Sequence, residues 1–242
     1  MIRLVLLFAC VAAQEPKKEP PKYKPGDTTR PRPQVVDPGT PTKPPADAVV
    51  LFDGKDWSEW ARTGKAADPV PTWKIADGYA EIVPRGGNIV TKKKFGDAQI
   101  HIEWATPAVV KGNGQGRGNS GVKLGGFGEV QILDSFENDT YPDGQAAALY
   151  QRFPPLVNAS RKPGEWQSFD IFTQLSRQDE AGKVERKARV TILHNGVLVH
   201  HAVELPGKVG EFNILLQDHG NPVRFRNLWV RKVGEYDENG KK

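Results

Sequence analysis

The chain has 242 residues and a formal net charge of +5, from 34 Lys and Arg against 29 Asp and Glu. Its single Cys and single Met are Cys10 and Met1, which excludes a disulfide framework and thiol chemistry after Cys10. Arg3 contributes +1, residues 14–47 contribute +2 (seven basic against five acidic residues), and the remaining +2 falls on residues 48–242. Because no segment concentrates the positive charge, the composition does not indicate a nucleic-acid-binding protein.

Residues 1–13 have the pattern of a short secretory signal peptide. Arg3 precedes an apolar run, which ends in small or apolar residues at 11–13, as cleavage sites do. The run is far shorter than the roughly 20 residues that a transmembrane span needs. We therefore predict a secreted or periplasmic protein without a transmembrane segment. The residues around Cys10 also resemble a lipoprotein box, so a lipid anchor on Cys10 is the alternative.

Residues 14–47 read as a disordered linker rich in Pro and Lys. This segment contains ten prolines in 34 residues and almost no large apolar side chains. Such a composition cannot bury enough apolar surface to offset the entropy of ordering the chain. We predict an extended tether here.

Residues 48–235 read as an all-β domain, followed by a frayed tail at 236–242. Short apolar alternations are separated by Gly, Pro, Asn and Asp, and the Asn195-Gly196 and Asp77-Gly78 pairs are strong hairpin signals. No window sustains an amphipathic helix, so the pattern predicts a β-sandwich or jelly roll. The expected strands are 49–52, 72–75, 79–83, 88–91, 98–105, 120–124, 129–133, 146–150, 166–175, 187–194, 197–203, 212–217 and 223–232.

The stretch Gly118–Asp134 is expected to form two strands around a glycine-rich turn. On the return strand, Glu129 and Gln131 share one face and apolar side chains take the other. Alternation would place Asp134 with the apolar side chains, where an ionised carboxylate is costly unless it is paired. A one-residue bulge near Leu133 would return Asp134 to the Glu129 face. We predict a candidate site here, although a half-exposed strand whose polar side chains face water has the same pattern.

Two other strands carry candidate residues on one face. His101 and Glu103 stand about 7 Å apart along the expected strand, close enough to contact one ligand. An exposed outer sheet face would show the same pattern. Arg226, which shares a face with Arg224, is expected to clamp a carboxylate of a ligand or to pair with acids on a neighbouring strand.

Three candidates lie at strand ends or in a turn. His219 can act as a base or hydrogen-bond donor near neutral pH, although a single histidine in a turn is often structural. Tyr150 and Trp166 each lie beside a long loop and are expected to stack on a sugar ring, whereas core packing is favoured for the other tryptophans. The sequence contains no metal-ligand spacing, serine elbow, phosphate loop or dinucleotide motif, so no metal or cofactor is predicted.

Several short motifs, taken in order, resemble one known family. They are L-F-D-G-K at 51–55, N-S-G at 119–121, E-V-Q-I-L-D at 129–134, G-E-W at 164–166, N-G at 195–196, L-Q-D-H-G at 216–220 and R-N at 226–227. Together they resemble the 3-keto-disaccharide hydrolase domain family from about residue 49 to residue 232. The resemblance implies a concanavalin A-like jelly roll of two curved antiparallel sheets with a sugar-binding concave face. It also implies an exported protein that acts on glycosides oxidised at sugar C3, with an upstream sugar C3-oxidoreductase as a natural functional partner.

The E-V-Q-I-L-D strand is also similar to the E-x-D-x-x-E strand of retaining laminarinases, which share the fold. By position, Glu129 would be the nucleophile and Asp134 the acid/base, while Gln131 replaces the central Asp and cannot ionise. Retaining hydrolysis places its two carboxyl groups about 5 to 5.5 Å apart. Five residues of straight strand span roughly 16 Å. This distance argues against ordinary double displacement.

A ketone at C3 offers another route, because it acidifies the proton at C2. One base could remove that proton and expel the C1 substituent, and addition of water would complete a net hydrolysis. We assign Glu129 or His219 as the base, and Asp134 as an acid or orienting group. Gln131 and Asn119 would orient the sugar or bind the enolate. The residues expected to contact the sugar are His101, Glu103, Tyr150, Trp166 and Arg226.

Three functions follow from these patterns. Glu129, Asp134 and His219 together favour a glycoside-cleaving enzyme. The amide of Gln131 in place of an acid favours a non-catalytic carbohydrate-binding module of the same fold on a tether. A wall-associated scaffold is the third possibility, in which the basic Pro-rich segment does the binding, and only that function would be lost on deletion of residues 14–47.

Overall fold

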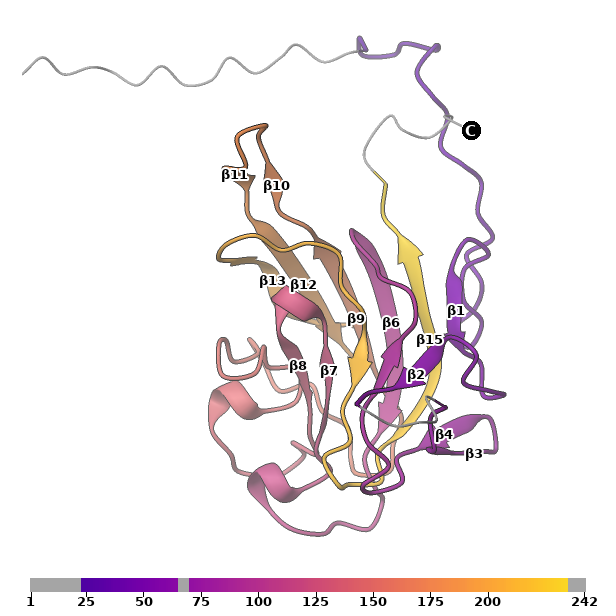
Figure 1. The fold of residues 1–242 in the computed structure, drawn as a ribbon, viewed down its shortest axis with the longest axis vertical. Coiled ribbons are helices and arrows are strands. Elements are labelled where there is room, and N and C mark those ends of the chain that lie inside the picture. The colour runs from indigo at the N-terminus through magenta and orange to yellow at the C-terminus, as the bar shows by residue number, and fades with distance from the viewer. Residues whose placement is uncertain (1–22, 65–69, 235–242) are drawn as a thin grey trace, which may run out of the picture. The chain divides into compact units, whose positions relative to one another are not determined.

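The computed structural model describes residues 23–64 and 70–234 (Figure 1). The expected signal peptide, the first part of the expected linker and the expected tail at 236–242 lie outside the described residues. One compact unit comprises Val35–Glu235, and the residues before it belong to a separate unit. Among the described residues, no helix has the length and apolarity that a membrane crossing requires.

The larger unit is a sandwich of two antiparallel sheets, as the strand pattern predicts (Figure 1). The larger sheet has 8 strands in the order β13-β12-β9-β6-β15-β4-β3, with β1 beside β15. Its strands are β1 (Val49–Phe52), β3 (Lys74–Ala76), β4 (Tyr79–Glu81), β6 (Ala98–Ala105), β9 (Gln167–Gln174), β12 (Ala188–His194), β13 (Val197–Leu205) and β15 (Arg224–Lys232).

The smaller sheet has 5 strands in the order β2-β5-β14-β7-β8. Its strands are β2 (Trp60–Arg62), β5 (Ile89–Thr91), β7 (Ser120–Lys123), β8 (Glu129–Ile132) and β14 (Leu215–Leu216). A separate hairpin joins β10 (Arg177–Gln178) to β11 (Val184–Arg186). The short 3-10 turns are η1 (Gly114–Gly116), η2 (Gly125–Phe127) and η3 (Pro142–Gly144).

The apolar side chains of both sheets meet in one core. Ile100 and Trp104 of β6 alternate inward from the larger sheet, and Val122 and Ile132 do so from the smaller one; all four are 0% exposed. Each large apolar side chain buried in this way contributes about 1.5–3 kcal/mol. The polar side chains between them must therefore point to the outer faces. This alternation determines the sheet face on which each candidate residue within a strand lies.

The two expected hairpin turns are confirmed. Asn195 has φ 52° and Gly196 has φ 79° between β12 and β13, while Asp77 has φ 52° and Gly78 has φ 77° between β3 and β4. A two-residue turn with positive φ at both positions matches the twist of the strands that it joins.

The expected strand at 146–150 is wrong as a regular strand. Ala147 has φ 68° and Gln151 has φ 56°, which interrupts the extended backbone. The segment nevertheless follows β8: Gln131 N–H donates to the Ala148 carbonyl (2.9 Å), and Tyr150 N–H donates to the Glu129 carbonyl (2.9 Å). The strands β2, β10 and β11 were not expected from the sequence, because each has only two or three residues and carries little alternation.

The folded unit begins upstream of the expected boundary at residue 48. Residues 35–47 of the expected linker belong to the same compact unit as the sandwich. Asn227 Nδ2 donates to the Pro41 carbonyl (3.3 Å), and Arg231 Nε lies 2.8 Å from Asp47 Oδ2. Polar contacts to β15, rather than apolar burial, hold this proline-rich segment on the larger sheet.

Candidate functional site

Glu129 and Gln131 lie on the outer face of the smaller sheet, as alternation predicts. β7 and β8 pair without a register shift, so Glu129 lies opposite Lys123 and Gln131 lies opposite Gly121. Val130 and Ile132 are buried in the core between the sheets. We call the outer-facing side chains of Asn119, Gly121, Lys123, Glu129 and Gln131, with Tyr141 and Tyr150 beside them, the Glu129 face.

The Glu129 carboxylate lies across the neighbouring strand. A Cβ atom at position 121 would overlap the Glu129 carboxylate, so Gly121 leaves open the space that this carboxylate occupies. Lys123 Nζ lies 3.4 Å from Glu129 Oε2, and the Glu129 side chain is 15% exposed. The result is a partly desolvated carboxylate with one nearby cation and one side open to solvent. A carboxylate in this setting is better suited to act as a base than a carboxylate whose oxygens are all paired.

The amides of Asn119 and Gln131 hold one another in place. Gln131 Nε2 donates to Gln115 Oε1 (3.1 Å) and to Asn119 Oδ1 (3.3 Å). Asn119 Nδ2 donates to the Gln115 carbonyl (2.7 Å), and both side chains are buried. Because their N–H groups already have protein acceptors, these amides are poorly suited to donate to an enolate. Of the two roles predicted for them, this arrangement favours orienting the sugar over donating to the enolate.

Two phenols stand beside Glu129. Tyr141 Oη and Tyr150 Oη are 2.6 Å apart. The pKa of Tyr141 is raised to about 12, first by burial, then by the hydrogen bond to Tyr150, and further by the negative charges of Asp143 and Glu129. Tyr141 therefore keeps its proton at neutral pH and can serve as a hydrogen-bond donor. Tyr150 was expected from the sequence; Tyr141 lies in a loop whose position no sequence pattern indicated.

His219 lies at the end of the smaller sheet nearest Asn119. Gln217 N–H donates to the Gly121 carbonyl (3.0 Å), and Ser120 Oγ donates to the Gln217 carbonyl (2.7 Å), so the chain after β14 continues beside β7. Asp218 then accepts the N–H groups of Gly87 and Gly220, both at 2.9 Å, which fixes the turn. The exposed imidazole of His219 has no hydrogen bond within the described residues.

Asp134 is not on the Glu129 face, and the expected bulge near Leu133 is wrong. Asp134 N–H donates to the Arg117 carbonyl (3.1 Å), one residue out of the register that pairs Ser120 with Ile132. The extra residue lies on the β7 side, where Gly118 has φ 60°, and not at Leu133. Asp134 is 3% exposed, and its Oδ2 accepts a hydrogen bond from Arg117 Nε at 2.6 Å. The costly buried carboxylate is thus satisfied by pairing. Glu129 and Asp134 point to different sides of the strand and do not form a double-displacement pair.

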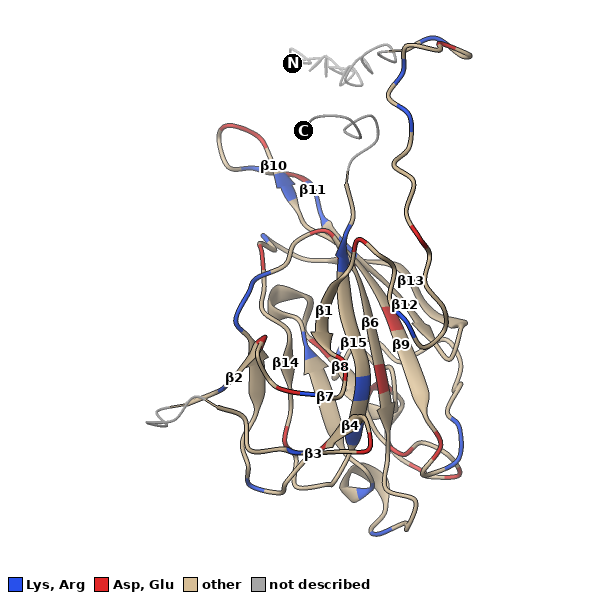
Figure 2. Cartoon of the chain, turned by 90° about the vertical axis from the view of Figure 1, so that its right-hand side faces the viewer, with Lys and Arg blue, Asp and Glu red and all other residues tan. Residues whose placement is uncertain are grey.

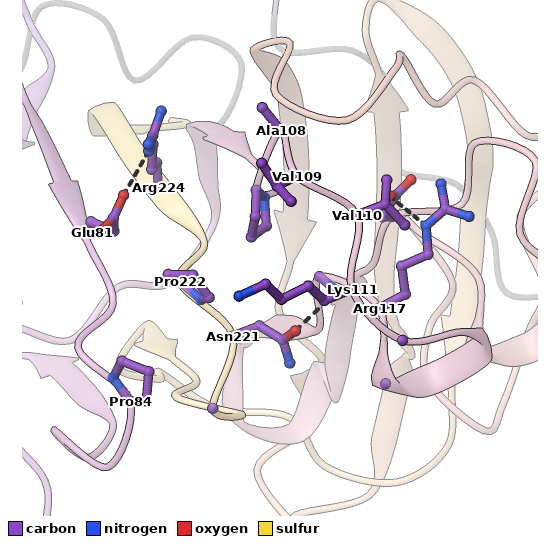
Figure 3. A pocket seen from close by; sticks show the side chains of 16 residues that line it. Glu81, Pro84, Ala108, Val109, Val110, Lys111, Arg117, Asn221, Pro222 and Arg224 are labelled. Carbon is purple, nitrogen blue, oxygen red and sulfur yellow. Dashed lines mark hydrogen bonds and ion pairs between the residues drawn. The ribbon is translucent and has the colours of Figure 1, made fainter.

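Asp134 instead lines a cavity at one end of the sandwich, which we call the end pocket (Figure 3). It has a volume of about 750 Å³. Its walls come from the loops at 107–112, 116–118 and 220–222, with Pro84, Glu81 and Arg224 opposite. Two residues that line the end pocket, Gly118 and Gly220, directly neighbour Asn119 and His219 in the chain.

The remaining sequence candidates lie on the opposite outer face, that of the larger sheet. His101 and Glu103 point outward from β6, and Asp170 of β9 lies opposite His101. His101 Nδ1 is 2.7 Å from Asp170 Oδ1, and Arg226 Nε donates to Glu103 Oε2 at 2.6 Å. Figure 2 shows acids on β6 and β9 beside arginines on β15. We call His101, Glu103, Asp170, Arg226 and Asn227 the His101 network.

The His101 network satisfies its own charges. Burial alone would lower the pKa of His101, but the hydrogen bonds and charges of Asp170 and Glu103 raise it to about 9. Burial alone would raise the pKa of Glu103, but hydrogen bonds from His101, Asn227 and Arg226 lower it to about 2. At neutral pH the network therefore holds an imidazolium between two carboxylates. Such pairing is typical of a structural ion network.

Trp166 belongs to this second face as well. The Arg226 guanidinium carbon lies 4.1 Å from the Trp166 ring centroid, and Tyr79 contacts its edge at 5.9 Å. One ring face is thus occupied by a cation of the protein itself. A small cavity of about 310 Å³ lies here, lined in part by Pro41, Thr42 and His101. Because the two faces are separated by the core, His101, Glu103, Trp166 and Arg226 cannot contact a sugar bound at Glu129.

A family model described as a 3-keto-alpha-glucoside-1,2-lyase-like domain matches residues 47–231 of the chain. Among solved structures, a candidate glycosyl hydrolase from Parabacteroides distasonis is 38% identical, with a TM-score of 0.78 and coverage of 86% of this chain and 95% of that chain. Two further candidate glycosyl hydrolases from this organism have TM-scores of 0.58 and 0.54 at 18% and 20% identity. They cover 78% and 77% of this chain and 94% and 99% of theirs, and they bear on the fold alone. None of the curated proteins compared with the chain is significantly similar to it.

Proposed function

Since the chain belongs to the family of 3-keto-alpha-glucoside-1,2-lyase-like domains, we propose that it cleaves glycosides whose sugar carries a ketone at C3. The family and the 38%-identical glycosyl hydrolase relative support a carbohydrate-active enzyme of hydrolase or lyase type. The ketone is the finer part of the proposal, and the substrate in the name of the family supports it. One observation carries the chemistry: the Glu129 carboxylate is held across Gly121 with one cation and two phenols nearby.

Glu129 is the base in this proposal. Its carboxylate takes the C2 proton, which the neighbouring ketone has made acidic, and the electron pair moves onto the C3 oxygen as an enolate. Lys123 Nζ lies 3.4 Å from Glu129 Oε2. Tyr141 and Tyr150 share one hydrogen bond at 2.6 Å, so one of the two phenol O–H groups is left to donate to the enolate oxygen.

Expulsion of the C1 substituent completes the elimination. The enolate electrons return to form the C1–C2 double bond, the C1–O bond breaks, and the leaving oxygen takes a proton. His219 is the proposed proton donor, because its imidazole is exposed and has no partner within the described residues. Water then adds its hydroxyl to C1 and its proton to C2, which gives a free 3-keto sugar and makes the sum a hydrolysis. Asn119 and Gln131 orient the sugar.

The test is release of a chromogenic leaving group from a 3-keto-glucoside by the full chain, with the unoxidised glucoside as the control substrate. In D2O, elimination followed by addition places deuterium at C2 of the product, beyond the exchange seen without enzyme. Glu129→Gln should abolish release, while Glu185→Gln, an exposed glutamate of β11, is the matched control. Equal release from both glucosides, or full activity of Glu129→Gln, would contradict the proposal.

A carbohydrate-binding module without catalysis is the second candidate function. It is favoured by the buried amide pair of Asn119 and Gln131, which stands where an ionisable residue would otherwise be expected. Saturable binding of the 3-keto-glucoside or of its unoxidised form, with no release of the leaving group, would support this alternative.

Export is a further part of the proposal, with residues 1–13 as the signal peptide and an oxidoreductase acting at sugar C3 as the source of the substrate. The mass of the mature N-terminus after expression in a bacterial host tests the first statement. Retention of residues 1–13 would contradict it, and a lipid mass on Cys10 would indicate anchoring instead.

A further inference from the structure

The proposed chemistry leaves the end pocket, a cavity of about 750 Å³, without an occupant. At two points, a residue that lines the pocket is followed or preceded in the chain by a residue at the Glu129 face. Gly118 lines the pocket while the next residue, Asn119, belongs to the face, and Gly220 lines it directly after His219. Asn221 Oδ1 accepts the Gly118 N–H at 3.1 Å, which ties these two points together. A group that leaves from a sugar near His219 therefore has this cavity beside it.

The walls of the end pocket are largely apolar. Pro84, Pro107 and Pro222 contribute rigid apolar surface, and Val109 and Val110 stand at its mouth, 71% and 47% exposed. The volume of about 750 Å³ falls within the range of small-molecule sites. Apolar walls of this kind suit an aromatic or similarly apolar group better than a second sugar, whose hydroxyls would be left without partners.

The end pocket also carries unneutralised positive charge. Arg117 is paired with Asp134 and donates to the carbonyls of Phe136 and Glu137. Arg224 pairs through Nε with Glu81 at 2.7 Å, and its guanidinium carbon lies 5.0 Å from the Tyr79 ring centroid; its terminal nitrogens have no hydrogen bond within the described residues. Lys111 has no ion pair within the described residues, and Figure 3 shows its side chain extending across the pocket toward Pro222.

We propose that the end pocket binds the leaving group of the substrate, and that this group is apolar and bears a carboxylate. The apolar body would pack on Val109 and the prolines. The carboxylate would pair with the Lys111 ammonium, with the terminal nitrogens of Arg224 as further donors. This assignment rests on the proposed function, because it names the part of the glycoside that departs from C1.

The experiment compares two 3-keto-glucosides, one of 4-hydroxybenzoate and one of the uncharged 4-hydroxybenzamide. We expect the KM of the full chain to be about tenfold lower for the benzoate, which corresponds to about 1.4 kcal/mol. Lys111→Gln should remove that difference. Lys94→Gln, at an exposed lysine without an ion pair among the described residues, should keep it. Val109→Glu places a negative charge at the mouth of the pocket, where it would repel the carboxylate of the benzoate substrate. The KM for the benzoate glucoside should therefore rise.

Titration of the full chain with free 4-hydroxybenzoate separates this inference from the proposed function. Binding that Lys111→Gln weakens and Lys94→Gln does not would support the pocket assignment even if neither glucoside were cleaved, and only the proposed function would then fail. Cleavage of both glucosides with equal KM, together with binding of the free acid that is absent or insensitive to Lys111→Gln, would overturn the assignment and leave the function standing.

Discussion

The two outer faces of the sandwich have the same kind of sequence pattern but differ in how their charged side chains are paired. Each has one strand along which polar side chains, one of them a glutamate, alternate with core residues. On the larger sheet, His101 has a carboxylate on either side, and Glu103 receives hydrogen bonds from Arg226 and Asn227. On the smaller sheet, Glu129 has one cation at 3.4 Å and neighbours that can donate to a ligand.

The difference shows how a charged group available for chemistry can be distinguished from one that stabilises the fold. A carboxylate whose partners all come from the protein gains nothing from a substrate, and its removal leaves an unpaired charge behind. A carboxylate with partners on one side only is available to a substrate on the other. The two faces should therefore respond to mutation in opposite ways, one in activity and one in stability.

Glu129→Gln should produce the largest effect on activity. Removal of a general base typically lowers the rate by about 10²–10⁴-fold, while the amide keeps the shape of the side chain. We expect kcat on the 3-keto-glucoside to fall by about 10³-fold, with the free energy of unfolding changed by less than about 1 kcal/mol. Steady-state kinetics and urea denaturation check the two halves of this statement. A large loss of stability with activity intact would reverse the assignment of the two faces.

Glu103→Gln should give the opposite signature. The substitution leaves Arg226 and a protonated His101 without their shared carboxylate, and breaking a buried pair costs about 3–5 kcal/mol. Because the Glu103 side chain is 11% exposed, we expect a loss of about 2–3 kcal/mol in the free energy of unfolding. The kcat of the folded fraction should stay within about twofold of the unmodified chain. A hundredfold fall in kcat at unchanged stability would place the catalytic site on this face.

The His101 network should also make stability depend on pH. The pKa of His101 is raised from 6.5 to about 9 in the folded state, so its stabilising contribution is fully present below pH 6.5 and is lost as pH rises through about 9. We expect the free energy of unfolding to fall by about 2–3 kcal/mol over this window. His101→Gln should flatten that part of the profile. Urea denaturation at several pH values measures it, and an unchanged slope in the variant would contradict the assignment.

Tyr141→Phe should have the smallest effect of the four. The substitution removes one hydrogen-bond donor next to Glu129 and breaks the 2.6 Å contact with Tyr150, but it leaves Tyr150 as a donor. We expect kcat to fall by about tenfold, with KM nearly unchanged, because a donor to the enolate acts only after the proton has moved. A larger change in KM than in kcat would make Tyr141 a contact of the ground-state sugar.

Much of this arrangement could be predicted from local sequence. Alternation placed Glu129 and Gln131 on one face, and the Asn195-Gly196 turn gave the hairpin of β12 and β13, because both depend on neighbouring residues only. The sequence could not show which sheet each strand joins. His101 and Glu129 were therefore expected to contact one ligand, although β6 lies within the larger sheet and β8 at the end of the smaller one.

Pairing between residues far apart in the chain could not be predicted from the sequence either. The requirement that a buried Asp134 be paired was correct, but its partner Arg117 lies one residue out of the register of β7 and β8 and became identifiable only in the folded structure. The contacts of residues 35–47 with Asn227 and Arg231 join segments far apart in the chain, so composition alone predicted a free tether. Lys123 had a usable signal, because continuing the hairpin register from the glycine-rich turn places it opposite Glu129.

The segment at 146–150 has a consequence for how the protein behaves among other chains. β8 is the last strand of its sheet, and an uncovered edge of this kind presents free N–H and C=O groups that another chain can extend. Ala147 and Tyr150 donate to the carbonyls of Gln131 and Glu129, and Gln131 donates to Ala148, while positive φ values at either end bend the segment away from a full strand. The same few residues that bring Tyr150 to the proposed base thus protect its strand from aggregation.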